Sequence, residues 1–534
     1  MYATMVASRT KNTKRNLIFS HLYTFITLLF QFISRSLIVY ALGSHYLGLS
    51  SLFTSILHVL SMSELGFSAA IIFNMYRPLA VGDTQAVCAL LNFYRCIYKK
   101  VATVIGIAGI VISLFLPRLI HGSYPTDINI YVLYYLYLAN TISSYIFFAY
   151  KAALLTALQR LDLTKIAYTA ASIVQYTGQM SALLLFRSYY GFLVWLIIGT
   201  VAKNLFTDYL SKRYFSQYKP IGEISEDIQR DISFRVKGLL ICNISAVTYT
   251  TFDSIILSSF IGLKSVAIYN NYVLILNGVM MFTGMLRASM QASVGNSIAT
   301  ETVEKNYDDM LIWQLIYSGI ATWCSTCMFC LYQPFMKIWM GENMLLPIRD
   351  VILLCLWFFF SIVTNSFCLY LTGIGAWWEM RWPFIVSTIL NLILNITLGK
   401  LIGITGIIFA TLTSTLISGL FWQCNIIFKV YFKRSTAQFY RRLLVYFFVC
   451  VACCGISTLL ADSIITTLTT ILNSLNSLLT SKVMGITGIT DIAGLFIRGI
   501  ICTIVAVGIQ LFLYSHLSFT KKEFKRAKSF IKRS

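Results

Sequence analysis

Fourteen apolar runs, each long enough to cross a lipid bilayer, constrain the fold of this chain more than any other feature. A transmembrane helix needs about 20 predominantly apolar residues. The 534 residues are 57% hydrophobic and 12% charged, whereas soluble domains carry about a quarter charged residues. The chain is therefore expected to be an all-α polytopic membrane protein with about 14 transmembrane helices. The runs lie at 17–42, 47–76, 98–120, 129–155, 163–186, 189–211, 235–261, 264–294, 311–336, 348–374, 380–400, 404–428, 441–461 and 492–514.

The distribution of positive charge indicates how these runs are oriented. Lys and Arg collect on the cytoplasmic side of membranes. With the N-terminus inside, the cytoplasmic segments hold 33 of them, the outer segments hold eight, and Arg35 alone lies at depth. An even number of spans then places both termini in the cytoplasm. The net charge of +22 is explained by this orientation and by contact with anionic membrane lipid, so no nucleic-acid partner is expected.

A helical hairpin near the N-terminus returns 219 residues later in the chain. The two copies cover 33–70 and 251–284. In each copy an apolar run leads to a glycine, Gly43 in the first and Gly262 in the second. A small residue follows five positions on, Gly48 in the first copy, and a second apolar run follows that. We expect these glycines to be helix-packing positions in two internal repeats.

The repeat predicts four parts: an N-terminal six-helix bundle at 1–211, a cytoplasmic linker at 212–234, a C-terminal six-helix bundle at 235–430, and two extra helices with a basic tail at 431–534. With six spans each, the halves enter the membrane from the same side. Isoleucines four residues apart in the linker predict a short helix on the inner surface. The Ser/Thr/Asn-rich stretch 462–491 is expected to be an exposed outer loop.

Two opposite charges, Arg35 and Asp253, mark nearly the same depth in the two repeats. Arg35 lies eight residues before Gly43 and Asp253 nine before Gly262, which is roughly 12 to 14 Å below each turn. An unpaired charge at the middle of a bilayer costs at least about 2.5 kcal/mol. Three alternatives remain open: a structural ion pair, an Arg35 that contacts an anionic substrate, or an Asp253 that binds a proton or cation and couples transport to it.

Other polar candidates are less specific. Glu64 lies in the inner half of the second run and is either an interhelical lock or a second acidic ion site, next to Gly66, which allows close helix approach. Arg287 and Lys151 fall at the inner membrane boundary. Each either contacts a substrate phosphate or merely orients its helix. The aromatic residues, 15% of the chain, are mostly assigned to the membrane interfaces, although a sugar-lined cavity would use the same residues.

The sequence shows no set of residues typical of an enzyme active site, and the chain is not expected to be an enzyme. The first outer turn holds only about four residues, 43–46, and no Walker P-loop is present. The thirteen cysteines are expected to be reduced. Cys324, Cys327 and Cys330 share a helix face, but the sequence places no His or carboxylate ligands with them, as a metal site would need. Neither a metal nor a cofactor is expected.

The chain resembles the Wzx-type flippases of the multidrug/oligosaccharidyl-lipid/polysaccharide (MOP) exporter superfamily, over roughly residues 10–430. The arrangement of Asp253, Gly262 and Tyr269 is its most specific part. The motifs that carry the resemblance are ALGSHYLGLSSLF, SELGFSAAI and MYRPLA in the first half and TFDSIILSSFIGLKSVAIYNN, GNSI and LYQPFMKIWMG in the second.

This resemblance implies a V-shaped, MATE-like pair of six-helix bundles around a central cavity that alternates between the two membrane faces. It implies a bacterial inner-membrane protein whose substrate is an undecaprenyl-pyrophosphate-linked oligosaccharide, an O-antigen or capsule repeat unit, and which works beside a glycan polymerase machinery. The two extra helices resemble those of fourteen-span lipid II flippases. No residue role is taken from the resemblance.

The two midplane charges suggest a mechanism. Arg35, Arg287 and Lys151 are candidates for substrate binding, and Asp253 and Glu64 for gating or for the coupling ion. A small-molecule cation exporter of the same fold is the first alternative. A component of a glycan assembly complex that transports nothing itself is the second.

Overall fold

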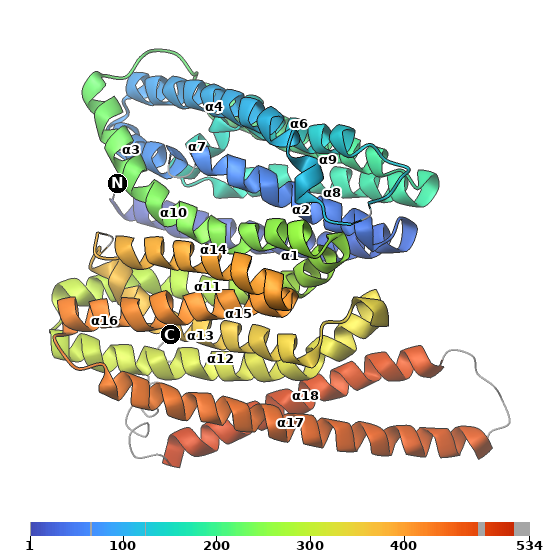
Figure 1. Cartoon of the computed structure of the whole chain (residues 1–534). Helices are drawn as coiled ribbons and strands as arrows, with labels where there is room; N and C mark the ends of the chain where they lie inside the picture. The colour runs from blue at the N-terminus through green and yellow to red at the C-terminus, as the bar shows by residue number, and fades with distance from the viewer. Residues whose placement is uncertain (1, 65–66, 123, 377, 479–485, 517–534) are drawn as a thin grey trace. The chain divides into compact units, whose positions relative to one another are not determined.

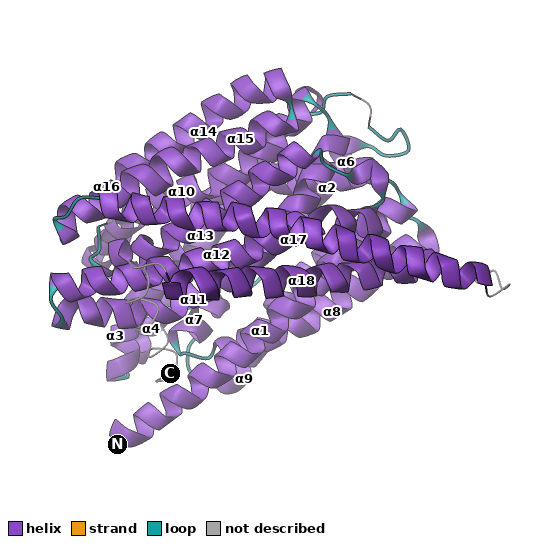
Figure 2. Cartoon of the chain, turned by 90° about the horizontal axis from the view of Figure 1, so that it is seen from below, coloured by secondary structure: helices purple, strands orange, loops and turns teal. Residues whose placement is uncertain are grey.

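The structure is a computed structural model that describes residues 2–64, 67–122, 124–376, 378–478 and 486–516 (Figure 1). Every described element is a helix, as Figure 2 shows. The all-α polytopic membrane fold that the sequence predicts is confirmed, and the helices fall into two compact units, Met1–Ala267 (unit 1) and Ile268–Ser534 (unit 2).

Unit 1 holds the first helices of the chain and the start of α11. They are α1 (Tyr2–Ala41), α2 (Ser44–Leu60), η1 (Ser61–Glu64), α3 (Phe67–Val81), α4 (Thr84–Ser113), α5 (Leu116–Leu119), α6 (Ile130–Ile146), α7 (Tyr150–Ala157), α8 (Leu161–Phe186), α9 (Tyr189–Tyr214) and α10 (Glu226–Phe260).

Unit 2 holds most of α11 and all later helices. They are α11 (Leu263–Thr300), α12 (Val303–Met340), η2 (Glu342–Met344), α13 (Ile348–Gly373), α14 (Arg381–Ile402), α15 (Ile404–Ser414), η3 (Thr415–Trp422), α16 (Gln423–Ile427), η4 (Phe428–Phe432), α17 (Ala437–Leu478) and α18 (Ile486–His516).

Each of the fourteen predicted runs falls on helix, but several are not simple rods. Within the described part of the chain, ten helices are long and apolar enough to cross a membrane, or eleven if α6 and α7, bent by 44°, form one span. The run 47–76 is interrupted between α2 and α3 by the 3₁₀ turn η1. The number fourteen therefore stays a prediction.

Short polar side chains begin several of these helices. Asp83 accepts a hydrogen bond from the Ala86 amide at 2.9 Å, and Ser188 accepts one from Gly191 at 3.1 Å. Asn129 accepts from the first amides of α6. Such caps satisfy amides that have no partner within the helix. They fix the starts of α4, α6 and α9. The starts of α6 and α9 coincide to within one residue with those of the predicted runs 129–155 and 189–211, whereas α4 begins before the run 98–120.

The two repeated hairpins turn in the same way. The amide of Gly43 donates to the carbonyl of Ile38 at 3.1 Å, and the amide of Gly262 donates to Leu257 at 3.0 Å, in each case five residues back. Both glycines have positive φ, 101° and 117°, which a residue with a side chain rarely adopts. At Gly48 a Cβ atom would lie only 2.1 Å from the Leu263 carbonyl oxygen, so α2 packs directly on the first residue of α11.

In unit 1, α8 packs mainly against α9 and α1, while α10 packs against α2 and α3. His58 Nδ1 lies 3.3 Å from the Thr251 hydroxyl and joins α2 to α10. Grouping by contacts assigns α10 to unit 1. The predicted domain limits, with a second bundle that begins at 235, stay a prediction.

In unit 2, the two extra helices α17 and α18 pack on each other and on α12. Polar side chains join them to α12. The Trp323 indole donates to Thr503 at 3.2 Å, and the Cys330 sulfur lies 3.4 Å from the Thr458 hydroxyl. The twelve cysteines whose side chains the structure describes are free. Small polar groups of this kind let membrane helices approach closely.

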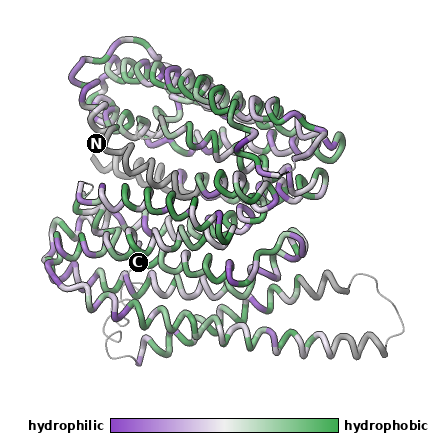
Figure 3. The backbone as a smooth tube through the Cα atoms, in the orientation of Figure 1, coloured by the Kyte–Doolittle hydropathy of each residue, from purple (hydrophilic) through white to green (hydrophobic). Residues whose placement is uncertain are grey.

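Two expectations about connecting segments are wrong. The stretch 462–491 is not an extended loop, because α17 continues to Leu478 and α18 begins at Ile486. Apolar residues such as Ile464 and Leu468 recur there at helical spacing, which the Ser/Thr content obscured. The linker holds no separate short helix, because its second half is the start of α10. Figure 3 shows hydrophilic residues gathered in the loop between α9 and α10.

The Gly48→Ala variant should be less stable than the natural protein. Its Cβ would meet the Leu263 carbonyl, a backbone atom that cannot move aside. Overpacking of this kind costs about 1–3 kcal/mol. The measurement is the midpoint of thermal unfolding of the purified protein in detergent. Gly278→Ala is the matched control, because nothing lies within 4 Å of the added atom there. Equal midpoints for the two variants would contradict the close packing.

Candidate functional site

The two charges that the sequence predicts near the midplane, Arg35 on α1 and Asp253 on α10, both lie in unit 1. Asp253 is fully buried, whereas Arg35 is partly exposed. The equivalent turns align Gly43 with Gly262, so Arg35 aligns with Ser254 and not with Asp253. Neighbouring positions on a helix point about 100° apart. Because α1 packs mainly on α8 and α10 mainly on α2, a pair between these charges stays a prediction.

Three buried tyrosines form a polar network beside Arg35. Tyr137 on α6 lies within electrostatic range of the Arg35 guanidinium. Its hydroxyl donates to Ser50 at 2.8 Å and lies 2.9 Å from the hydroxyl of Tyr189 on α9. Tyr189 donates to the backbone carbonyl of Tyr46 at 3.4 Å, and their rings meet edge to face with centroids 5.1 Å apart. Hydroxyls of α6 and α9 thus converge on α2.

The network continues to the turn between α1 and α2. The Tyr46 hydroxyl donates to the Asp127 carboxylate at 2.5 Å. Burial, and to a lesser extent this carboxylate, raises the pKa of Tyr46 above its ordinary value, so its hydroxyl stays protonated and remains a donor. Sequence reasoning missed this network, because it assigned the tyrosines to membrane interfaces and gave Asp127 no role. The position of Tyr46 in the short turn, three residues after the repeated Gly43, is the one signal that could have singled it out.

The candidate cations at the inner boundary differ in their surroundings. Lys151 on α7 is 3% exposed, and its ammonium donates to the backbone carbonyl of Tyr218 at 2.9 Å. Arg287 on α11 is exposed, and its guanidinium donates to the Asn365 amide oxygen at 3.2 Å. Arg287 therefore keeps most of its donors available, while Lys151 fastens the loop after α9 to α7. A substrate contact for either residue stays a prediction.

The acidic candidate Glu64 ends the 3₁₀ turn η1, between α2 and α3. Its side chain lies outside the described part of the structure, and so does the whole of Gly66. The roles predicted for these two residues, a lock or ion site and a packing position, stay predictions.

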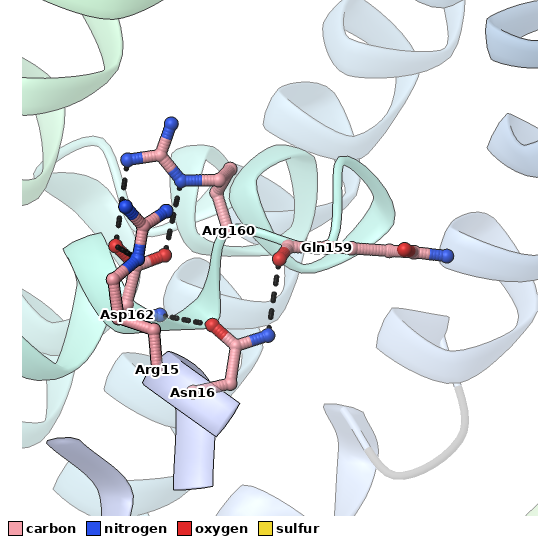
Figure 4. Close-up of polar contacts among 5 residues, drawn as sticks. All are labelled: Arg15, Asn16, Gln159, Arg160 and Asp162. Atoms are coloured by element: carbon pink, nitrogen blue, oxygen red, sulfur yellow. Dashed lines mark hydrogen bonds and ion pairs between the residues drawn. The ribbon is translucent and has the colours of Figure 1, made fainter. Parts of the chain in front are cut away.

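A charged cluster joins the start of α1 to the turn between α7 and α8 (Figure 4). The Asp162 side chain, 2% exposed, lies 2.8 Å from Arg15 Nε and 3.0 Å from Arg160 Nε. Asn16 accepts from the Asp162 amide at 2.8 Å and donates to the Gln159 carbonyl at 3.0 Å. Two guanidinium groups on one carboxylate leave a net positive charge. The cluster joins α1 at Arg15 and Asn16 to the start of α8, and sequence reasoning did not single out Asp162.

Comparison with protein-family models and with curated protein sequences gives no match. Solved structures do match. An inward-facing MATE family transporter of the MOP superfamily has a TM-score of 0.61 at 15% identity over 76% of this chain and 94% of that one. The lipid II flippase MurJ, in an inward closed conformation, has a TM-score of 0.60 at 14% identity over 92% of this chain and 98% of that one.

The chain has the fold of the MATE transporters and of MurJ. A eukaryotic MATE transporter has the same fold, with a TM-score of 0.55 at 11% identity over 80% of this chain and 97% of that one. The match to MurJ leaves 8% of the chain, about 43 of 534 residues, unmatched. Because α17 and α18 hold 42 and 31 residues, the MurJ-like fold must include part of this extra pair.

Within this fold, the Asp162 cluster should hold α1 in place. Asp162→Ala leaves Arg15 and Arg160 without their shared carboxylate, so the ion pairs that join α1 to the start of α8 are lost. We expect faster hydrogen–deuterium exchange in the α1 segment around Asn16, measured by mass spectrometry. Glu226→Ala is the control, because its pair with Arg230 is exposed and contributes little. Unchanged exchange in Asp162→Ala would show that α1 is held by its apolar contacts alone.

Proposed function

We propose that this chain is a flippase that moves an undecaprenyl-pyrophosphate-linked oligosaccharide, an O-antigen or capsule repeat unit, from the cytoplasmic to the periplasmic leaflet. It works by alternating access in a bacterial inner membrane, with both termini in the cytoplasm. A glycan polymerase machinery is its expected neighbour. The proposal rests on the MOP-type fold and on the polar groups that unit 1 holds inside apolar helices.

The observation that carries the proposal is the extent of the match to MurJ. That protein is a lipid II flippase, and its match extends over 92% of this chain, which includes part of the pair α17 and α18. The matches to the two MATE transporters cover 76% and 80% of this chain. A substrate with a long lipid tail gives a use for extra helices that a transporter of small soluble cations does not need.

The proposed mechanism assigns Arg35, Lys151 and Arg287 to the pyrophosphate. Guanidinium groups form strong paired hydrogen bonds with phosphate oxygens. Asp253, fully buried on α10, and Glu64 are the proposed sites of a coupling proton or sodium ion. A buried carboxylate changes its charge on binding a cation, and the cost of burying that charge links ion binding to conformation.

A small-molecule cation exporter is the second candidate. The match to the MATE family transporter, with a TM-score of 0.61, favours it. A fully buried Asp253 would suit a cationic substrate as well as it suits a coupling ion. Export of a cationic dye by the purified protein, without movement of lipid-linked glycan, would decide for this candidate.

The test uses the full chain in liposomes with a fluorescent undecaprenyl-pyrophosphate-linked oligosaccharide, whose arrival in the outer leaflet is followed by chemical quenching. Arg35→Ala should slow translocation by about tenfold or more, because a hydrogen bond to a charged group contributes about 1.5–3 kcal/mol. Asp253→Asn should abolish the response to an ion gradient. Arg118→Ala is the control, an exposed cation at the end of α5.

The double variant Arg35→Ala, Asp253→Asn separates transport roles from structural ones. If it regains the translocation that both single variants lose, the two residues form a structural pair and the assigned roles are wrong. If the natural protein moves no lipid-linked glycan, the flippase proposal itself fails.

A further inference from the structure

A polar pocket opens where three turns of unit 1 meet. These turns join α1 to α2, α5 to α6 and α8 to α9, and the charge distribution predicts all three on the outer side. The cavity has a volume of about 510 Å³, within the usual range of roughly 300–1,000 Å³ for small-molecule sites. Its polar lining consists of His45, Tyr46, Tyr124, Thr126, Asp127 and Arg187.

The pocket wall is held in place by the tyrosine network. Tyr46 holds Asp127 through its hydroxyl, and the backbone carbonyl of Tyr46 is itself held by Tyr189. The loop between α5 and α6, which carries Asp127, has a second anchor, because the Asn129 amide donates to the Tyr190 hydroxyl at 2.8 Å. A site whose groups are already fixed loses little entropy when a ligand binds.

Two lining groups keep hydrogen-bonding capacity for a ligand. Arg187, an exposed cation, ends α8 in the left-handed conformation with φ 45°. The Asp127 side chain is exposed, and its hydrogen bond to Tyr46 uses only the Oδ2 atom. Donors and acceptors therefore face the same cavity.

These groups match the chemistry of a sugar ring. Hydroxyls need both donors and acceptors, and the apolar face of the ring packs on an aromatic side chain such as Tyr124, which is 43% exposed. One arginine and one aspartate nearly cancel in charge, so the pocket does not favour a phosphate. Its polar lining does not suit a lipid tail.

We propose that this pocket binds a neutral saccharide on the outer side of the protein, an inference that rests on the proposed function for its biological source. Either the head group that has just crossed the membrane or a soluble glycan supplies the sugar. Both present the same hydroxyl-rich ring to Tyr124, Asp127 and Arg187.

Saturation-transfer NMR of the full chain in lipid nanodiscs tests the pocket directly. Free N-acetylglucosamine, glucuronate and inorganic phosphate are the probes. N-acetylglucosamine should bind, and Tyr124→Ala and Arg187→Ala should each weaken it by about tenfold or more. Tyr131→Ala and Arg118→Ala are matched controls, because both side chains are exposed and neither lines the cavity. Thermal midpoints of all four variants confirm that they fold.

The outcomes separate this inference from the flippase proposal. Tight phosphate binding lost in Arg187→Ala, with no N-acetylglucosamine signal, would overturn the saccharide assignment, and so would equal sugar binding in every variant. If the sugar binds as expected, the liposome assay identifies its source: slower translocation in Tyr124→Ala indicates the head group, and unchanged translocation indicates a soluble glycan. Sugar binding by a protein that moves no lipid-linked glycan would refute only the proposed function.

Discussion

The absence of water from the bilayer core is the constraint on which the rest of this structure depends. Backbone amides and carbonyls must find partners within the helices themselves, and polar side chains must find partners within the protein. Unit 1 meets the second demand with hydroxyl groups: Tyr137, Tyr189 and Ser50 satisfy one another between α2, α6 and α9. Unit 2 does so with Thr and Cys side chains between α12 and α17.

The sequence predicts the helices well, because hydrophobicity acts locally and each apolar run had to become helix. It predicts their interruptions poorly. The bend of 44° between α6 and α7 lies inside an apolar stretch, where composition gives no signal. The 3₁₀ turn after α2 has the sequence SMSE, a short polar break that lies inside the run predicted as one span. Composition also misled at the C-terminal end of α17. Ser and Thr suggested a loop, but their apolar neighbours keep the helical period to Leu478.

The candidate site residues were predictable only in part. A charged residue in an apolar run is conspicuous in the sequence, whereas a tyrosine there is common. Arg35 and Asp253 could be found from the sequence for that reason. Asp127 and Asp162 lie in or near connecting segments, where acidic residues are common. They gain importance only from partners far away in the chain: Tyr46 is 81 residues from Asp127, and Asn16 is 146 residues from Asp162. Such pairings are set by tertiary packing.

The two repeats share a backbone and differ in chemistry just below the turn. Aligned on Gly43 and Gly262, Ser34 corresponds to Asp253 and Arg35 to Ser254, so each repeat holds a serine beside a charge, with opposite sign and one residue apart. Ser34 and Ser254 are both buried, so the position that lacks the charge is also inside the protein. Opposite charges at offset positions therefore give the two repeats different chemistry on the same backbone turn. The proposed mechanism uses this difference, because it assigns the anionic substrate to Arg35 and the coupling cation to Asp253.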